Sequence, residues 1–435
     1  MMRAEYDNTL AALRRRCDTG DAAGAVALAL NLTWYWQMFD RHSDAAYWLG
    51  EALAVPGGEP SPDRDRARAI QLLNRLGPLM GTTAEEAADD RAELVELAGR
   101  LLTDPELPGT YGVLIALPLA FLRGERAAPA IIERLVDGED VWLSGLAHMF
   151  RARFAENAGE LERTRGDVEA ALACFRRVGD QWGQANVLPM RAQLRQYDDD
   201  LDGALADLRE ARSLGGEFGS LSLSDEVFGE LRWIDLHLRR GDTDLVLATI
   251  DSARERAPRA NSPELLILVE AWEALFRVRL GDVDRARELL DHAERGLRPG
   301  APFPGGHARA LLGSVRTSLC LELGDPAGAE RALARTYAAA LDTRDMPIMS
   351  MAAVNAAALA QAYGRHREAA VLLGAASRLR GAHDRTDRQV RDLTHRARAA
   401  LGERAFDAAY GEGWGLDGRA AVAAVDPARS ILLDK

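Results

Sequence analysis

A turn followed by an amphipathic helix recurs along this chain of 435 residues, and this repeat limits the possible folds more than any other feature. From Gly241 onward, successive turns are 40, 43 and 40 residues apart. The turn positions are Gly166-Asp167, Asp199, Gly241-Asp242, Gly281-Asp282, Gly324-Asp325 and Gly364-Arg365. A repeat of this length predicts an array, because one such unit cannot bury its apolar face alone and must stack on its neighbours.

The helices that follow these turns share one packing pattern. A small or short side chain stands five residues after the turn position, at Ala171, Ala204, Val246, Ala286, Ala329 and Ala369. A larger apolar side chain stands nine residues after it, at Phe175, Leu208, Ile250, Leu290, Leu333 and Leu373. This spacing places both on one helical face, where the small residue lets a neighbouring helix approach closely. We expect the turn glycine to end the preceding helix in a left-handed conformation and the aspartate to cap the next helix.

In these features the units resemble tetratricopeptide (TPR) repeats, although their period is longer than the usual period of about 34 residues. The resemblance implies an all-α fold, a right-handed α-solenoid of TPR-like helix pairs with a C-terminal helical cap. No segment shows the alternation of apolar and polar residues that strands require.

The clarity of the repeat divides the chain into three predicted parts. Residues 1–160 are expected to form N-terminal TPR-like helix pairs that diverge after residue 56, residues 161–380 to form TPR-like repeats, and residues 381–435 to form a helical cap and tail. In the diverged part we expect helices at 67–79, 85–102, 110–122, 128–136 and 141–157. The tail reads as one helix, a short helix after Leu401-Gly402, a glycine-rich turn and a last short helix.

Aromatic residues are concentrated near the N-terminus, within residues 32–53: Trp34, Tyr35, Trp36, Phe39, Tyr47 and Trp48. If Asp40 takes the turn position, Ala45 and Leu49 occupy the small and large positions of the repeat. We therefore interpret the segment as one helix pair, in which Trp36 and Phe39 pack near Trp48 and Leu49. The alternative is that some of these aromatics, Tyr35 or Trp34 first, line a ligand surface.

Composition excludes several classes of function. The net charge is −13, and the only lysine is Lys435, so the chain lacks the basic surface that binds nucleic acid. The three cysteines are far apart and odd in number, which argues against a disulfide framework and for a cytoplasmic protein. No signal peptide is visible, and the uncharged runs at 22–39 and 108–122 read as buried helices of a soluble protein rather than membrane spans.

Three segments carry a more specific resemblance. They are "EYDNTLAALRRRCDTGDAAGAVALALNLTWYWQMFDRHSDAAYWLGEALAVPG", "AENAGELERTRGDVEAALACFRRVGDQWGQANVL" and "AAVLLGAASRLRGAHDRTD" with its continuation "ARAALGERAFDAAYGEGWGLDGRAAVAAV". They resemble the C-terminal TPR-like region of actinobacterial SARP/AfsR-type, BTAD-containing transcriptional regulators, which are related to large LuxR-type ATPase regulators. In that family a winged-helix DNA-binding domain, an activation domain and an NTPase module precede the array. This chain has no Gly-x-x-x-x-Gly-Lys-[Ser/Thr] phosphate loop and no basic, strand-containing DNA-binding module, so neither ATP nor DNA binding is carried over.

No catalytic, metal-binding or cofactor motif stands out. The eight histidines are scattered, and no Gly-x-Ser-x-Gly nucleophile motif occurs. We therefore expect no cofactor, no metal and no enzyme. The remaining candidates are polar or aromatic residues within helix-packing stretches that could face a groove and a partner: Tyr35, Asn157, Gln184, Asn186, Arg191 and Asn355. Each could equally be a solvated or capping side chain.

The resemblance implies a regulatory, sensor and protein-interaction module of such a transcriptional regulator. Its partner would be a protein or peptide, among them the regulator's own DNA-binding and NTPase modules, with a small-molecule effector as a further option. The alternative is a free-standing TPR scaffold or peptide-binding protein unrelated to transcription.

Overall fold

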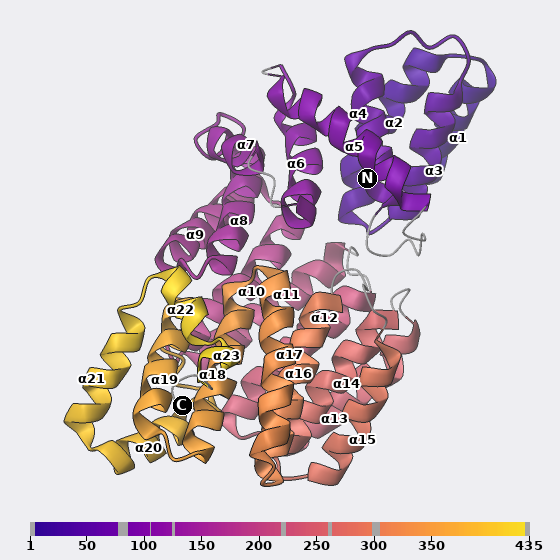
Figure 1. Cartoon of the computed structure of the whole chain (residues 1–435). Coiled ribbons are helices and arrows are strands. Elements are labelled where there is room, and N and C mark those ends of the chain that lie inside the picture. Colours follow the sequence, from indigo (N-terminus) through magenta and orange to yellow (C-terminus); the bar gives the residue numbers. More distant parts are fainter. Residues whose placement is uncertain are drawn as a thin grey trace. The chain divides into compact units, whose positions relative to one another are not determined.

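The structure, a computed structural model, is all-α over the residues that it describes, which are 5–76, 86–104, 106–123, 127–218, 223–259, 263–297 and 305–430 (Figure 1). The first helices are α1 (Tyr6–Asp18), α2 (Ala22–Met38), α3 (His42–Ala54), α4 (Pro62–Arg75), α5 (Glu86–Thr103), α6 (Gly109–Arg123), α7 (Ala127–Val136) and α8 (Val141–Asn157). Then come α9 (Leu161–Val178), α10 (Gln181–Tyr197), α11 (Leu201–Phe218), α12 (Leu223–Arg240), α13 (Thr243–Arg256), a 3₁₀ turn (Ala257–Arg259), α14 (Pro263–Arg279) and α15 (Val283–Gly296). The last are α16 (Gly305–Glu322), α17 (Pro326–Thr343), α18 (Met346–Ala362), α19 (His366–Arg380), α20 (Arg388–Leu401), α21 (Glu403–Trp414), α22 (Gly418–Ala424) and α23 (Pro427–Ser430).

The chain forms two compact units. Unit 1 comprises residues 1–148, 173–183 and 215–222, and unit 2 comprises residues 149–172, 184–214 and 223–435. Unit 1 therefore holds α1 to α7, and unit 2 holds α12 to α23, while α8 to α11 contribute residues to both. The helices predicted in the diverged part of the sequence correspond to α4 to α8.

The aromatic segment lies in the core of unit 1. Trp36 is fully buried together with Leu49, and Trp48 belongs to the same core, against which Phe39 packs. The indole Nε1 of Trp36 donates a hydrogen bond to the hydroxyl of Tyr6 at 3.0 Å. The aromatic side chains of this segment, except the exposed Tyr47, therefore join helices of this unit, as the repeat register around Asp40 predicts.

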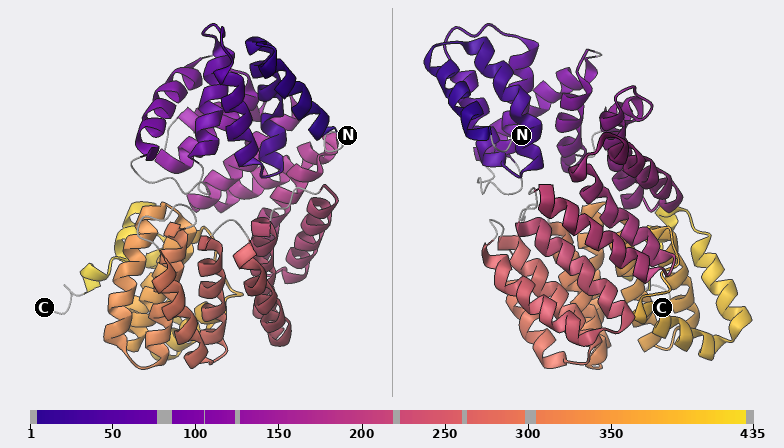
Figure 2. Two further views of the ribbon diagram at one scale, coloured as in Figure 1. Left: turned by 90° about the vertical axis from the view of Figure 1, so that its right-hand side faces the viewer. Right: turned by 180° about the vertical axis from the view of Figure 1, so that it is seen from behind.

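In unit 2 the helices form stacked pairs. The partners α12–α13, α14–α15, α16–α17 and α18–α19 pack side by side, and α12, α14, α16 and α18 also pack one on the next (Figures 1 and 2). The first helices of successive pairs consequently form one continuous layer. This arrangement is the α-solenoid that the repeat predicts.

Left-handed backbone conformations mark the turns of the array. The φ angles at Asp40, Asp199, Gly241, Gly281, Gly324 and Gly364 are 53°, 65°, 90°, 82°, 70° and 73°. Two aspartates thus adopt the conformation that glycine adopts elsewhere, which aspartate tolerates better than most side chains. The predicted aspartate cap forms at Asp325, which accepts a hydrogen bond from the Gly328 amide at 2.8 Å. It does not form at Asp242 or Asp282, because these carboxylates pair with His237 and Arg277 instead.

The predicted turn at Gly166-Asp167 is wrong. Both residues lie inside α9, and the turn is at Gly159, whose φ is 71°. The shift is seven residues, close to two helical turns, so the buried face is the same in either register. Thr164 and Val168, five and nine residues after Gly159, are buried just as Ala171 and Phe175 are.

A C-terminal helical cap follows α19, formed by α20 to α22, as the sequence predicts. Glycines allow α21 to cross α19 closely. A Cβ atom added at Gly374 would lie 2.1 Å from the carbonyl oxygen of Tyr410, and one added at Gly413 would lie 1.9 Å from that of Val371. Both positions therefore exclude any side chain.

Within the described residues no helix is long and apolar enough to cross a membrane. The uncharged runs at 22–39 and 108–122 fall in α2 and α6.

Candidate functional site

A cavity of about 450 Å³ lies within unit 2. Its lining comes mainly from α10, α12, α14, α16 and α18, the first helices of successive pairs, and from α19 and the segment that joins α19 to α20. The volume lies within the range of about 300–1,000 Å³ that is usual for small-ligand sites. The apolar part of the lining includes Phe228, Leu231, Leu268, Trp272, Leu275, Leu311, Ile348, Met351 and Val354. The polar part includes Gln193, Gln196, Tyr197, Arg232, Asp235, Arg239, Arg279, Arg380, Asp384 and Asp387.

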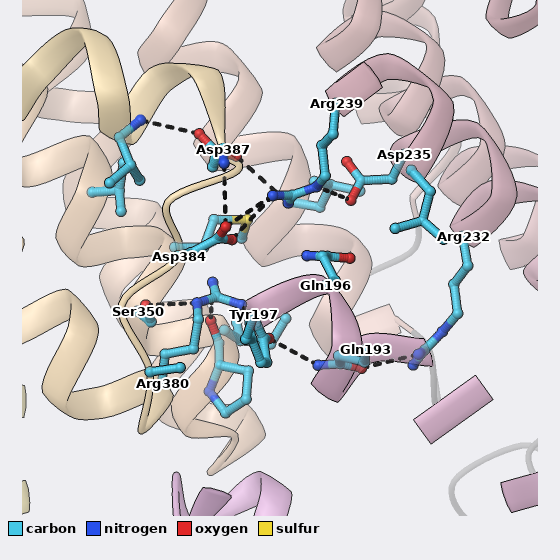
Figure 3. A pocket seen from close by; sticks show the side chains of 18 of the residues that line it. Gln193, Gln196, Tyr197, Arg232, Asp235, Arg239, Ser350, Arg380, Asp384 and Asp387 are labelled. Atoms are coloured by element: carbon cyan, nitrogen blue, oxygen red, sulfur yellow. Dashed lines mark hydrogen bonds and ion pairs between the residues drawn. The ribbon is translucent and has the colours of Figure 1, made fainter. Parts of the chain in front are cut away.

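Arg239 is the centre of an ionic network in the cavity lining (Figure 3). Its guanidinium contacts Asp235 of the same helix at 2.7 Å and Asp384 at 3.0 Å, and it donates a further hydrogen bond to the Thr386 hydroxyl at 2.8 Å. Although burial alone would lower the pKa of Arg239, the three nearby aspartates raise it above its ordinary value. Arg239 is therefore a permanent cation held by its counter-charges.

Asp387 connects the same network to α14. Its carboxylate contacts Arg279 at 3.0 Å and Arg239 at 3.7 Å, and it also accepts a hydrogen bond from the Val390 amide, which caps α20. Burial would raise the pKa of Asp387, but the charges of Arg279 and Arg239, with smaller contributions from the Val390 hydrogen bond and from Arg380, outweigh burial and lower it to about 2. Asp387 thus stays ionised at neutral pH.

The segment from Gly381 to Asp387 is held by hydrogen bonds within itself and by a close backbone contact at Gly381. The Asp384 carboxylate accepts hydrogen bonds from the backbone amides of Thr386 and Asp387 at 3.3 and 3.2 Å. At Gly381, where φ is 80°, an added Cβ would lie 2.4 Å from the carbonyl oxygen of Gly159. The turn between α8 and α9 therefore packs against the end of α19, which brings the first and last repeats of unit 2 together around the cavity.

A second row of polar contacts crosses the cavity from α19 to α12 (Figure 3). Arg380 donates to the Tyr197 hydroxyl at 3.1 Å, and the same oxygen accepts from Gln193 Nε2 at 3.0 Å. Gln193 Oε1 in turn accepts from Arg232 at 2.9 Å. Arg380 also donates to Ser350 Oγ at 3.3 Å and to the Pro347 carbonyl at 3.5 Å.

Comparison with solved structures relates this architecture to known proteins. The fold is similar to that of a Rap protein complexed with competence and sporulation factor, with a TM-score of 0.55 and 12% identity, over 87% of this chain and 99% of the Rap chain. The fold is TPR-like. A lower similarity, with a TM-score of 0.40 and 13% identity over 85% of this chain and 55% of the other, relates it to a signal transduction ATPase with numerous domains and a tetratricopeptide repeat sensor from Pyrococcus horikoshii. Models of protein families give no match, and neither do the sequences of curated proteins.

The six residues predicted to face a partner are dispersed over the TPR-like fold. Tyr35 is buried in unit 1, with its ring 4.8 Å from that of Tyr6 and 4.6 Å from that of Phe39. Asn157 ends α8 and is half-buried, and Gln184 and Asn186 are half-buried on α10.

The other two of the six connect neighbouring helices. Arg191 of α10 binds both carboxylate oxygens of Asp207 on α11, at 3.0 and 2.7 Å. Asn355 of α18 is buried, and its Nδ2 donates to Ser314 Oγ of α16 at 2.5 Å. None of the six belongs to the described lining of the cavity, and a partner-binding role for each stays a prediction.

The sequence alone did not identify the residues that line the cavity. On α12 the lining residues Phe228, Arg232, Asp235 and Arg239 are spaced by four, three and four positions. Charged residues at helical spacing on the apolar face of a first helix were the available signal. The partners of Arg239 on the joining segment, Asp384 and Asp387, lie more than 140 residues later in the chain, and no local pattern connects the two segments.

Proposed function

We propose that this chain is a non-enzymatic, TPR-like sensor module that binds a short peptide, or a peptide segment of a partner protein, in the cavity of unit 2. The observation that carries the proposal is the composition of the cavity lining. Apolar side chains such as Trp272 and Met351 offer surface for a ligand's side chains, and polar groups such as Gln196 and Tyr197 offer hydrogen bonds to a main chain. The Rap structure with competence and sporulation factor supports a binding role for this kind of fold.

The proposal extends to the regulator from which the array comes. The three resembling segments support a SARP/AfsR-type transcriptional regulator, in which peptide binding would control linked DNA-binding and NTPase modules in the cytoplasm. The native reading frame tests this part. A winged-helix domain and a phosphate loop encoded ahead of Met1 are expected, and their absence there would favour the free-standing scaffold.

Selection of peptides on the purified chain tests the binding role. Met351 lines the cavity, so Met351→Trp fills part of it, whereas Leu323→Trp adds the same side chain at an exposed site outside the described lining. Peptides enriched on the native chain are expected to bind Leu323→Trp equally and Met351→Trp at least ~10-fold more weakly, which corresponds to ~1.4 kcal/mol. Failure to enrich any peptide, or equal binding to all three proteins, would contradict the proposal.

A further inference from the structure

We propose that the ligand of the unit 2 cavity presents a carboxylate to Arg380 and Tyr197, and that this carboxylate is the free C-terminus of a peptide. The inference rests on the proposed function, because it presumes that the cavity binds a peptide. The inference goes further in naming the chemical group that the cavity recognises and the end of the peptide that binds at Arg380.

The first observation is that Arg380 has no direct ion pair among the described residues. Arg239 and Arg279 are paired with Asp235, Asp384 and Asp387 at 2.7 to 3.7 Å. Arg380 lines the same cavity but has no carboxylate within 4 Å among the described residues, and its three partners, Tyr197, Ser350 and the Pro347 carbonyl, are neutral.

Asp384 and Asp387 act on Arg380 only at longer range. Both carboxylates have direct partners already, that of Asp384 in Arg239 and Thr386 and that of Asp387 in Arg279. A guanidinium in a cavity wall that lacks a direct counter-charge favours an anionic ligand, since a buried charge is costly unless it is paired. Arginine also matches a carboxylate in geometry, through two parallel hydrogen bonds.

The second observation is a free donor beside Arg380. The Tyr197 oxygen accepts hydrogen bonds from Arg380 and Gln193, and in the described part of the chain its own hydroxyl hydrogen has no acceptor. This hydrogen can be donated to a ligand oxygen at the position where Arg380 also donates. The two side chains therefore offer adjacent donors to one anionic group.

The third observation favours a peptide terminus over an acidic side chain. Gln196 precedes Tyr197 on α10 and lines the cavity, and among the described residues its side-chain amide has no hydrogen-bond partner (Figure 3). A side-chain amide offers both a donor and an acceptor and can pair with a peptide group. The last peptide bond of a ligand lies next to its C-terminal carboxylate, so Gln196 and Arg380 would bind neighbouring groups.

Three pools of N-acetylated random hexapeptides test the inference on the native chain. The first lacks Asp and Glu and has free C-termini, the second is the same pool with amidated C-termini, and the third is amidated and contains one Asp or Glu. The first pool is expected to bind at least ~10-fold more tightly than the second. Equal binding of the first and second pools would overturn the carboxylate, and binding restored in the third pool would overturn the C-terminus.

Failure of all three pools to bind would instead contradict the proposed function itself.

Variants of the chain supply a second readout. Arg380→Gln is expected to remove the preference for free acids over amides, whereas Arg331→Gln, an exposed arginine of α17 outside the described lining, should keep it. If Arg380→Gln does not fold, the comparison of the three pools on the native chain still decides.

Discussion

At the scale of single residues, two buried or half-buried arginines and three aspartates fix one side of the cavity. Asp387 has two roles in this network, since it neutralises Arg279 and Arg239 and also caps α20. Replacement by asparagine separates these roles, because the amide oxygen can still accept from the Val390 amide while the charge is lost.

Asp387→Asn is expected to lower the free energy of unfolding by about 3 kcal/mol at pH 7, because it removes the closest counter-charge of the half-buried Arg279 and a second one from Arg239. The pKa of Asp387 falls from an ordinary value of about 3.9 to about 2 on folding. Its charge therefore stabilises the fold above about pH 4, and this contribution is lost as the pH falls towards 2. Urea unfolding should show the difference between native chain and variant shrinking over that range.

The matched control is Asp284→Asn. This carboxylate is 92% exposed and pairs with Arg287 of its own helix. A change within about 0.5 kcal/mol is expected there, as for most surface ion pairs. An effect of Asp387→Asn no larger than that of the control would show that the network is not a stabilising one.

At the scale of helices, the sequence predicts most elements correctly for a physical reason. Turns such as those at Gly281 and Gly324 need a left-handed residue, and the small and large side chains after them define the packing face, so both are visible locally. The turn near Gly166 was misplaced because a shift of seven residues preserves that face. The cavity was not predictable in this way, since Arg239 and Asp384 meet only through the stacking of the whole unit.

The crossing of α19 and α21 makes a prediction at this scale. Gly374→Ala is expected to destabilise unit 2 by about 2 kcal/mol, because the new methyl group would lie 2.1 Å from the Tyr410 carbonyl and force the helices apart. Gly229→Ala, in α12, meets no atom within 4 Å and should stabilise by about 0.5–1 kcal/mol. Thermal unfolding distinguishes the two, and a stabilising Gly374→Ala would contradict the close crossing.

At the scale of the whole molecule, unit 2 joins repeats that are distant in sequence around one cavity. Gly159 meets Gly381, Tyr197 meets Arg380, and Arg239 meets Asp384. A ligand bound there contacts several repeats at once, so binding should stabilise these segments together and raise the free energy of unfolding. The gain is about 2.7 kcal/mol when the free ligand is at a hundred times its Kd.

The most direct test of peptide binding in the unit 2 cavity is amide hydrogen exchange of the whole chain with and without an enriched peptide. We expect slower exchange in residues 228–239, 268–279 and 381–387, which contain lining residues of the cavity, and no change in residues 22–54 of unit 1. Protection confined to unit 1, or no protection at saturating peptide, would contradict peptide binding in this cavity.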